Sequence, residues 1–330
     1  MTTTRVRNPA WEAPVLRGCT EASAWCREVT IDLGQVEAVA DWMAFEAFPA
    51  AAPDPAGLAL GPEERADRID FTLVTTAINF AYTDFATGVP WSVEHEGREL
   101  VDADAMFLRF EQALAAGVPV TSGEWLAELT QERLAEVLHG PRPIPMLAER
   151  VAVLREVGRT LTPYDGRFST WVASCAPRAL ADGDGLLERI VADFAAFDDT
   201  ASLHGVDVRI DKLAQLGLWT LHRTGLVPLP DVDVLSVFAD YIVPAALRAM
   251  RVLVYAPGLA AAVDGGELLP AGSAREVELR VQTIVACGLL TDALNARRAE
   301  PVVGAQVDYR FWSAFHEHIR PHHLTVTTRY

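Results

Sequence analysis

The spacing of apolar residues along the chain predicts a mainly helical protein. From Leu33 to Phe48, apolar side chains recur every three or four residues, as they do on the buried face of an amphipathic helix. That face consists of Val36, Val39, Ala40 and Met43. Similar patterns predict helices over residues 67–85, 104–116, 146–161, 179–197, 208–224, 244–255 and 274–296. We therefore expect a mainly helical, all-α fold with at most a minor β hairpin.

Local signals mark the ends of these elements. Ser273 and Glu276 form a capping-box pattern at the start of the longest predicted helix. Residues 91–100 alternate between polar and apolar side chains around Glu96-Gly97, which predicts the hairpin. Residues 49–62 are rich in Pro, Ala and Gly, so we expect a loop there.

Composition and charge exclude several classes of protein. The chain has 330 residues, half of them apolar, which suggests one large domain or about two smaller ones. A formal net charge of −17 disfavours duplex DNA or whole tRNA as a partner, because phosphate binding needs a cationic face. The most apolar stretch, 234–263, contains Asp240, Arg248 and Arg251. We therefore expect no membrane span and, without a signal-peptide pattern, a cytoplasmic protein.

Familiar metal and nucleotide motifs are absent from the sequence. The cysteines form no CxxC pair, and there is no P-loop, GxGxxG or GxSxG motif. Histidines near the C-terminus, which do not share one helix face, are His316, His318, His322 and His323. We expect no metal, and the missing motifs disfavour nucleoside triphosphatases, dinucleotide oxidoreductases and α/β-hydrolases.

Two segments contain candidate chemistry. Asp240 lies among apolar and aromatic residues, so it is either a desolvated acid beside Phe238 and Tyr241 or a cap of the following helix. Lys212 is the single lysine among 28 cationic residues. It could hold a phosphate as a compact ammonium, or it could pair with Asp211 at the surface.

Two other charged pairs have structural interpretations. Glu276 and Arg280 are four residues apart, the spacing of a helical salt bridge. Asp198 and Asp199 follow an apolar segment and are expected at a helix end or a solvated turn, not as a catalytic dyad.

Taken in order, these segments resemble the queuosine salvage protein family, the queuosine 5′-phosphate N-glycosylases. The similarity covers about 300 residues. It is carried by segments 29–34, 77–80, 113–119, 144–150, 154–158, 211–215, 238–244, 275–280 and 308–312. Segment 211–215 is similar to the family's KRAQ motif and segment 238–244 to its ADYRVPQ motif. Leu213 and Ile242 stand where those motifs have arginine.

The resemblance implies a fold and a reaction. It implies a helical fold similar to that of helix-hairpin-helix DNA glycosylases, in a single domain over 1–330 whose two helical lobes could hold the pocket between them. It also implies hydrolysis of the N-glycosidic bond of queuosine 5′-monophosphate, which releases queuine for salvage into tRNA modification. No cofactor is implied, and the partner is a small-molecule nucleotide, with no direct contact to nucleic acid or membrane.

Glycosidic chemistry suggests roles for the matching residues. The transition state carries positive charge on the ribose, so we assign the catalytic carboxylate to Asp240. Phe238 and Tyr241 are expected to wall the flat base, and Lys212 to hold the phosphate or ribose. The full set of expected substrate-binding residues is Lys212, Phe238, Tyr241, Asn79, Phe80, Asp308, Trp312, Glu276 and Arg280. Among these, Asp308 would read the cationic amine of the substrate and Asn79 the base.

Other functions stay open at this point. Leu213 and Ile242 motivate a divergent N-glycosidase that acts on another modified nucleotide. A non-catalytic nucleotide- or base-binding protein could use the same scaffold, although a neutral base gains little from a buried anion. A purely structural helical scaffold would bind no nucleotide at all.

Overall fold

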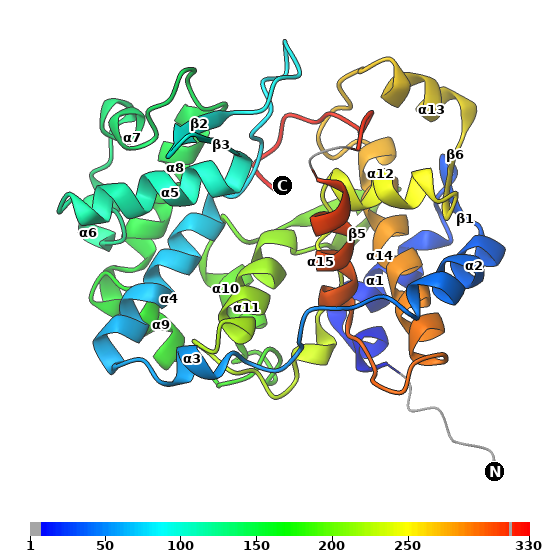
Figure 1. Cartoon of the computed structure of the whole chain (residues 1–330), viewed down its shortest axis with the longest axis horizontal. Coiled ribbons are helices and arrows are strands. Elements are labelled where there is room, and N and C mark those ends of the chain that lie inside the picture. Colours follow the sequence, from blue (N-terminus) through cyan, green and yellow to red (C-terminus); the bar gives the residue numbers. More distant parts are fainter. Residues whose placement is uncertain (1–7, 317–318) are drawn as a thin grey trace. The chain divides into compact units, whose positions relative to one another are not determined.

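The computed structural model describes residues 8–316 and 319–330. The chain forms two compact units, and each is built from separate stretches of sequence. Unit 1 contains the described residues up to Pro53, together with Asp199–Arg223 and Leu229–Val326. Unit 2 contains Asp54–Asp198, Thr224–Pro228 and Thr327–Tyr330. Both units are mainly helical (Figure 1).

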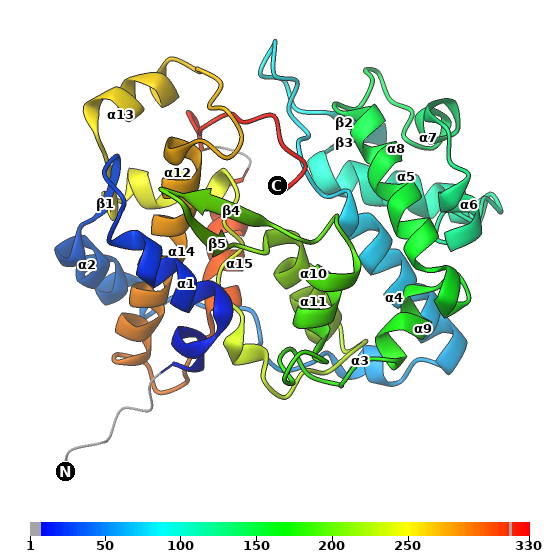
Figure 2. The same ribbon diagram turned by 180° about the vertical axis from the view of Figure 1, so that it is seen from behind.

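Unit 1 surrounds one long central helix. Its helices are α1 (Pro14–Ser23), α2 (Leu33–Met43), α11 (Lys212–Arg223), α12 (Ile242–Ala249), α13 (Pro257–Asp264), α14 (Ala274–Asn295) and α15 (Gly304–Phe315), with 3₁₀ turns η1 (Pro9–Glu12) and η3 (Val232–Val234). Its strands are β1 (Val29–Ile31), β4 (Thr200–Leu203), β5 (Val206–Arg209) and β6 (Leu253–Tyr255). Helix α14 contacts α1, α2, α12 and α15, which lie around it in Figures 1 and 2.

The central helix is buried on all sides. Leu279, Ile284 and Val285 of α14 are buried, although they point in different directions around the helix axis. A helix with this pattern belongs in the interior of a domain, whereas an amphipathic helix covers a surface. Glu276, Glu278 and Arg280 share this buried environment, so each of these charged groups needs a partner in unit 1.

Unit 2 consists of shorter helices and one hairpin. The helices are α3 (Pro55–Leu58), α4 (Pro62–Ala77), α5 (Asp102–Ala115), α6 (Gly123–Ala127), α7 (Gln131–Val137), α8 (Leu147–Thr160), α9 (Phe168–Ala173) and α10 (Leu186–Asp193), with the 3₁₀ turn η2 (Thr162–Tyr164). The strands are β2 (Ser92–His95) and β3 (Arg98–Val101). An aromatic cluster in its core consists of Phe168, Trp171, Phe194 and Phe197.

Several predictions from the sequence are confirmed. Helix α2 buries the four residues that its spacing predicted. The hairpin forms with Glu96 at φ 50° and Gly97 at φ 74°, which are the left-handed conformations that a two-residue turn requires. Helix α14 begins after Ser273, whose hydroxyl accepts a hydrogen bond from the Glu276 amide at 3.4 Å.

Two predicted helices in unit 2 are wrong in their bounds. The helix expected at 67–85 is α4, which begins at Pro62 and ends at Ala77. The chain beyond it is irregular, with Ala81 at φ 45°, and the buried guanidinium of Arg150 binds the carbonyl oxygens of Ile78, Phe80 and Ala81. Within the helix expected at 179–197, the structure has only the shorter helix α10, Leu186–Asp193.

Two predicted helices in unit 1 include strands. The segment 208–224 begins in β5, which pairs with β4, and only from Lys212 onwards is it helical. The segment 244–255 contains α12, which begins at Ile242, and then β6, which pairs with β1. Periodicity in a short apolar run does not distinguish a buried strand from a helix, and the partner of β6 is far away in the sequence.

The structure also bears on the expectation of no membrane span. Over the described ranges, no helix is both long enough and apolar enough to cross a bilayer.

Candidate active site

Asp240 lies at the start of helix α12, at the end of a buried loop. Its Oδ1 atom accepts hydrogen bonds from the backbone amides of Ile242 at 2.7 Å and Val243 at 3.3 Å. These bonds satisfy amides that a helix N-terminus leaves without partners. No described residue forms a hydrogen bond with Oδ2, and the Asp240 side chain keeps partial exposure. The cap predicted as the alternative is therefore real, and it leaves one oxygen for other chemistry.

Lys212 is the first residue of helix α11, and Ile210 and Asp211 separate it from the end of strand β5. Asp211 adopts φ 51°, a left-handed conformation in which the chain turns from strand to helix. Lys212 is 6% exposed, so the predicted surface pairing with Asp211 is wrong. Asp211 instead pairs with Arg209 at 3.0 Å, and burial raises the pKa of Asp211 to about 6.

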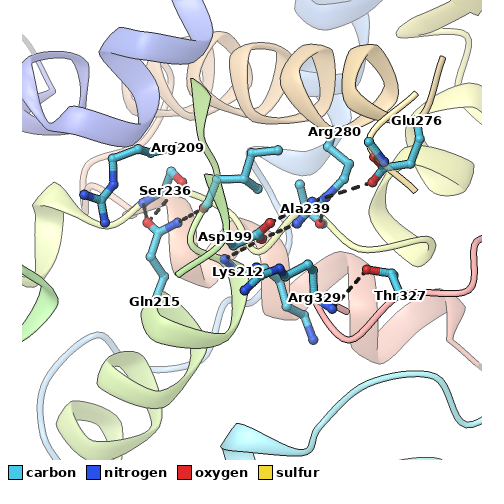
Figure 3. A network of polar contacts seen from close by, with 12 residues as sticks. Asp199, Arg209, Lys212, Gln215, Ser236, Ala239, Glu276, Arg280, Thr327 and Arg329 are labelled. Atoms are coloured by element: carbon cyan, nitrogen blue, oxygen red, sulfur yellow. Dashed lines mark hydrogen bonds and ion pairs between the residues drawn. The ribbon is translucent and has the colours of Figure 1, made fainter. Parts of the chain in front are cut away.

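Gln215 connects α11 with the loop that leads to Asp240. Its Oε1 accepts hydrogen bonds from the backbone amide and the hydroxyl of Ser236 at 2.8 and 3.1 Å. Its Nε2 donates to the carbonyl of Ile210 at 2.9 Å, and Figure 3 shows Gln215 beside Ser236. The buried side-chain amide of Gln215 thus links helix α11, which contains Lys212, to the loop that leads to Asp240.

Arg280 of α14 organises the other side of this cluster. Its guanidinium forms a two-pronged ion pair with Asp199 and donates from Nε to the carbonyl of Ala239 at 3.0 Å (Figure 3). Glu276, one turn earlier, lies 3.6 Å from Arg280, as the sequence predicted. Asp199 also accepts from the backbone amide of Lys212 at 3.3 Å. Asp199 is 3% exposed, so the predicted solvated turn is wrong for this residue.

Asp308 of α15 completes the cluster. Its Oδ1 accepts from the backbone amide of Phe238 at 2.8 Å, so it holds the residue two positions before Asp240. Asp308 is 6% exposed. The assembled charged groups are Asp199, Glu276, Asp240, Asp308, Lys212 and Arg280. This set contains four carboxyl groups and two cations, and each carboxyl group that is ionised favours a positive charge on a group that enters the cluster.

Burial and mutual charge shift the pKa values of these groups. Burial raises the pKa of Asp240, while Lys212, the two amide hydrogen bonds and Arg280 oppose that rise. Burial and the charge of Asp240 raise the pKa of Asp308 well above its ordinary range. Burial lowers the pKa of Lys212, which Asp240 and Asp308 counteract. Lys212 therefore interacts electrostatically with both Asp240 and Asp308, and the pKa of each of these carboxyl groups is raised above its ordinary value.

Aromatic side chains flank the cluster in unit 1. Phe238 is buried, and Tyr241 is partly exposed, with its ring 4.5 Å from that of His322. Trp312 lies one turn after Asp308 on α15 and stacks on His316 at 4.1 Å. Of the ten predicted site residues, unit 1 thus contains eight: Asp240, Lys212, Phe238, Tyr241, Asp308, Trp312, Glu276 and Arg280.

The two remaining predicted residues belong to unit 2. Asn79 accepts a hydrogen bond at Oδ1 from the hydroxyl of Tyr82 at 3.1 Å. Phe80 is buried, with the guanidinium of Arg150 4.5 Å from its ring centre. Their predicted contact with the base stays a prediction.

Sequence reasoning missed Asp199 as a member of the cluster. The available signal was Arg280 itself, because a buried arginine requires acids that accept its hydrogen bonds, and such an acid need not lie on the same helix. For metals, no group of three or more ligand-type side chains gathers anywhere in the described ranges, and His318 lies outside them.

Comparison with known proteins identifies the family of this chain. The sequence profile of the queuosine salvage protein family matches residues 60–330. A Sphaerobacter thermophilus protein named queuosine 5′-phosphate N-glycosylase/hydrolase is 35% identical over 249 residues, covering 74% of each chain. Proteins of the same name are 28% identical in Dictyostelium discoideum, over 67% of this chain and 69% of the relative, and 25% identical in Bos taurus, over 78% of each. This chain belongs to the queuosine salvage protein family.

Proposed function

We propose that this protein hydrolyses the N-glycosidic bond of queuosine 5′-phosphate and releases queuine and ribose 5-phosphate. The observation that carries the proposal is the half-capped carboxylate of Asp240 in a buried, acid-rich cluster, within a chain whose relatives bear the name of that activity. We infer that queuine then returns to tRNA modification, that the protein acts in the cytoplasm, and that its helical scaffold is related to helix-hairpin-helix DNA glycosylases.

The chemistry requires an anion near C1′ of the ribose. When the bond from C1′ to the base nitrogen breaks, its electron pair leaves with the base and the ribose acquires oxocarbenium character. Oδ2 of Asp240 would stabilise this cation and take a proton from the attacking water, whose oxygen forms the new bond to C1′. Oδ1 stays with the α12 amides, so the carboxylate cannot rotate away. The leaving base gains one proton, which balances the proton that Asp240 takes from water, and it departs as queuine.

Lys212 would support this carboxylate. A general base must be ionised at working pH, and burial alone pushes Asp240 toward its neutral form. The ammonium of Lys212 is the first of the groups that oppose this effect. We therefore place Lys212 beside Asp240 as the residue that keeps it charged. The phosphate contact predicted for Lys212 and the amine contact predicted for Asp308 stay predictions.

A Lys212→Met variant tests this assignment. Removing the ammonium raises the pKa of Asp240 further, so the acidic limb of the kcat profile should move to higher pH. If Lys212 only binds the phosphate, KM for queuosine 5′-phosphate rises and the acidic limb stays in place, which would contradict the assignment. Lys212→Arg keeps a cation and is the conservative control.

A second candidate function is hydrolysis of a different modified nucleotide. The observation that favours it is that Leu213 and Ile242 are 2% and 3% exposed. Apolar side chains at these places cannot donate the hydrogen bonds that arginines supply. If the arginines of the family motifs contact the substrate, their replacement here would change which substrate is bound. If they do not, the replacement would change only side-chain packing.

The direct experiment is a product assay. The purified chain is incubated with queuosine 5′-phosphate, and free queuine and ribose 5-phosphate are measured by mass spectrometry. Equal amounts of both products support the proposed function. If the folded protein yields neither, a thermal-shift series of modified nucleotides separates the second candidate, which is stabilised by another nucleotide, from a structural scaffold, which is stabilised by none.

A further inference from the structure

The segment that follows helix α15 places two histidines against the site. His322 and His323 are 6% and 3% exposed. The next residue, Leu324, accepts a hydrogen bond at its carbonyl from the Leu269 amide at 2.8 Å, which fixes the segment within unit 1. The His322 ring packs on Tyr241, the neighbour of Asp240. The positive charge of Arg280 contributes to lowering the pKa of His323.

The hydrogen bonding of His322 defines its tautomer. Its Nδ1 atom lies 2.9 Å from the carbonyl oxygen of His323, and a carbonyl oxygen only accepts. Nδ1 must therefore carry the hydrogen. Burial lowers the pKa of His322 to about 4, so the ring is neutral at pH 7. A neutral ring with hydrogen on Nδ1 has a lone pair on Nε2, which can only accept a hydrogen bond.

The Nε2 atom of His322 is buried and has no hydrogen-bond partner in the described part of the chain. Buried ring nitrogens in folded proteins nearly always have a partner, because an unpaired one costs desolvation free energy. The position of this atom, on the ring that stacks against Tyr241, puts it beside the catalytic loop. Its partner must be a donor.

We propose that Nε2 of His322 accepts a hydrogen bond from an N–H group of the queuine part of the substrate, and that His322 is a specificity-determining residue. This inference rests on the proposed function. The 5′-phosphate is a poor partner, since its second pKa is about 6, so at neutral pH most of it carries no hydrogen and its oxygens would face a lone pair. A 7-deazaguanine base presents ring and exocyclic N–H donors. His322 would thus read the base while Asp240 acts on the ribose.

The test uses two variants and two readouts. His322→Phe keeps an aromatic ring against Tyr241 and removes the acceptor, whereas His322→Gln offers an amide oxygen in its place. We expect His322→Phe to weaken the inhibition of the reaction by free queuine about 10- to 100-fold, with an equal loss in kcat/KM. His322→Gln should recover part of both. His139→Phe, a change at an exposed histidine of unit 2, is the matched control and should resemble the wild type.

The outcomes separate this inference from the proposed function. Thermal melting without ligand identifies a variant that does not fold, in which case the other variant decides. Suppose that the wild-type protein releases queuine, and that His322→Phe and His322→Gln both bind queuine as tightly as the wild type. The role of His322 is then refuted and the proposed function stands. If wild-type protein releases no queuine and does not bind it, the proposed function itself has failed.

Discussion

Each unit contains an arginine surrounded by acids, and the two clusters differ in exposure. In unit 2, Arg167 at the start of α9 pairs with Glu63, Asp67 and Asp70 of α4 at 2.8, 2.5 and 2.7 Å. The side chains of Glu63 and Asp67 are 80% and 66% exposed, and only Asp70 is buried. In unit 1, Arg280 and its partners Asp199 and Glu276 are all 5% exposed or less.

The difference in exposure shows how burial changes the role of an arginine–acid cluster. Exposed ion pairs are screened by water, so each adds little to stability and the geometry can vary. A buried arginine without its acid is costly, so Arg280 fixes Asp199 on one side and the Ala239 carbonyl on the other. The Arg167 cluster therefore fastens two helices together, whereas the Arg280 cluster holds the loop that presents Asp240.

The largest expected effect is on catalytic activity, and we expect it in unit 1 but not in the Arg167 cluster. Asp240→Asn removes the negative charge but keeps the shape and one oxygen for the α12 amides, so kcat should fall at least about 10³-fold with the fold intact. Asp70→Asn makes the same change in the Arg167 cluster and should leave kcat unchanged, because Glu63 and Asp67 still pair with Arg167. The comparison is measured by steady-state queuine release and by thermal melting. Near-wild-type turnover of Asp240→Asn would remove Asp240 from catalysis.

The next effect concerns stability. Asp199→Ala leaves the guanidinium of Arg280 buried without its two-pronged partner, which should lower the free energy of unfolding by about 3–5 kcal/mol. Glu63→Ala removes an exposed partner of Arg167 and should cost less than about 1 kcal/mol. Urea denaturation of both variants measures the difference. Equal losses would mean that exposure does not distinguish the clusters.

A smaller effect should appear when the pH is lowered. The pKa values of His322 and His323 in the folded protein are about 4 and 3, below the ordinary value of 6.5. Below pH 6.5 the unfolded chain binds protons that the folded chain does not, so stability falls with pH. From pH 7 to pH 5 each histidine should cost about 2 kcal/mol.

The His322→Phe variant isolates this contribution, because it removes one of the two groups. Urea denaturation at pH 7 and pH 5 should show a loss of stability about 2 kcal/mol smaller in the variant than in the wild type. Identical losses in the two proteins would contradict the assignment of His322 as a buried neutral ring. His139→Phe, at an exposed position, should show the full wild-type loss.

The sequence by itself determined the local structure where the signal was local. The apolar face of α2, the Glu96-Gly97 turn and the Ser273 cap of α14 depend on residues a few positions apart, and all three are as predicted. The family was also evident from the order of its motifs. The sequence singled out Asp240 and Lys212 as well, because an acid among apolar residues and a single lysine are visible without coordinates.

Only the tertiary structure decided which residues surround Asp240. Asp199 and Arg280 are 81 positions apart, and Phe238 and Asp308 are 70 apart. No periodicity connects such positions, since their contact depends on how helices pack. The same reason explains the misjudged strand β6, whose partner β1 lies far away in the sequence. Strand β5 pairs with the adjacent strand β4, and its apolar residues were assigned to the helix that follows. The dependence on packing also explains His322, whose acceptor atom gains significance only because the fold buries it against Tyr241.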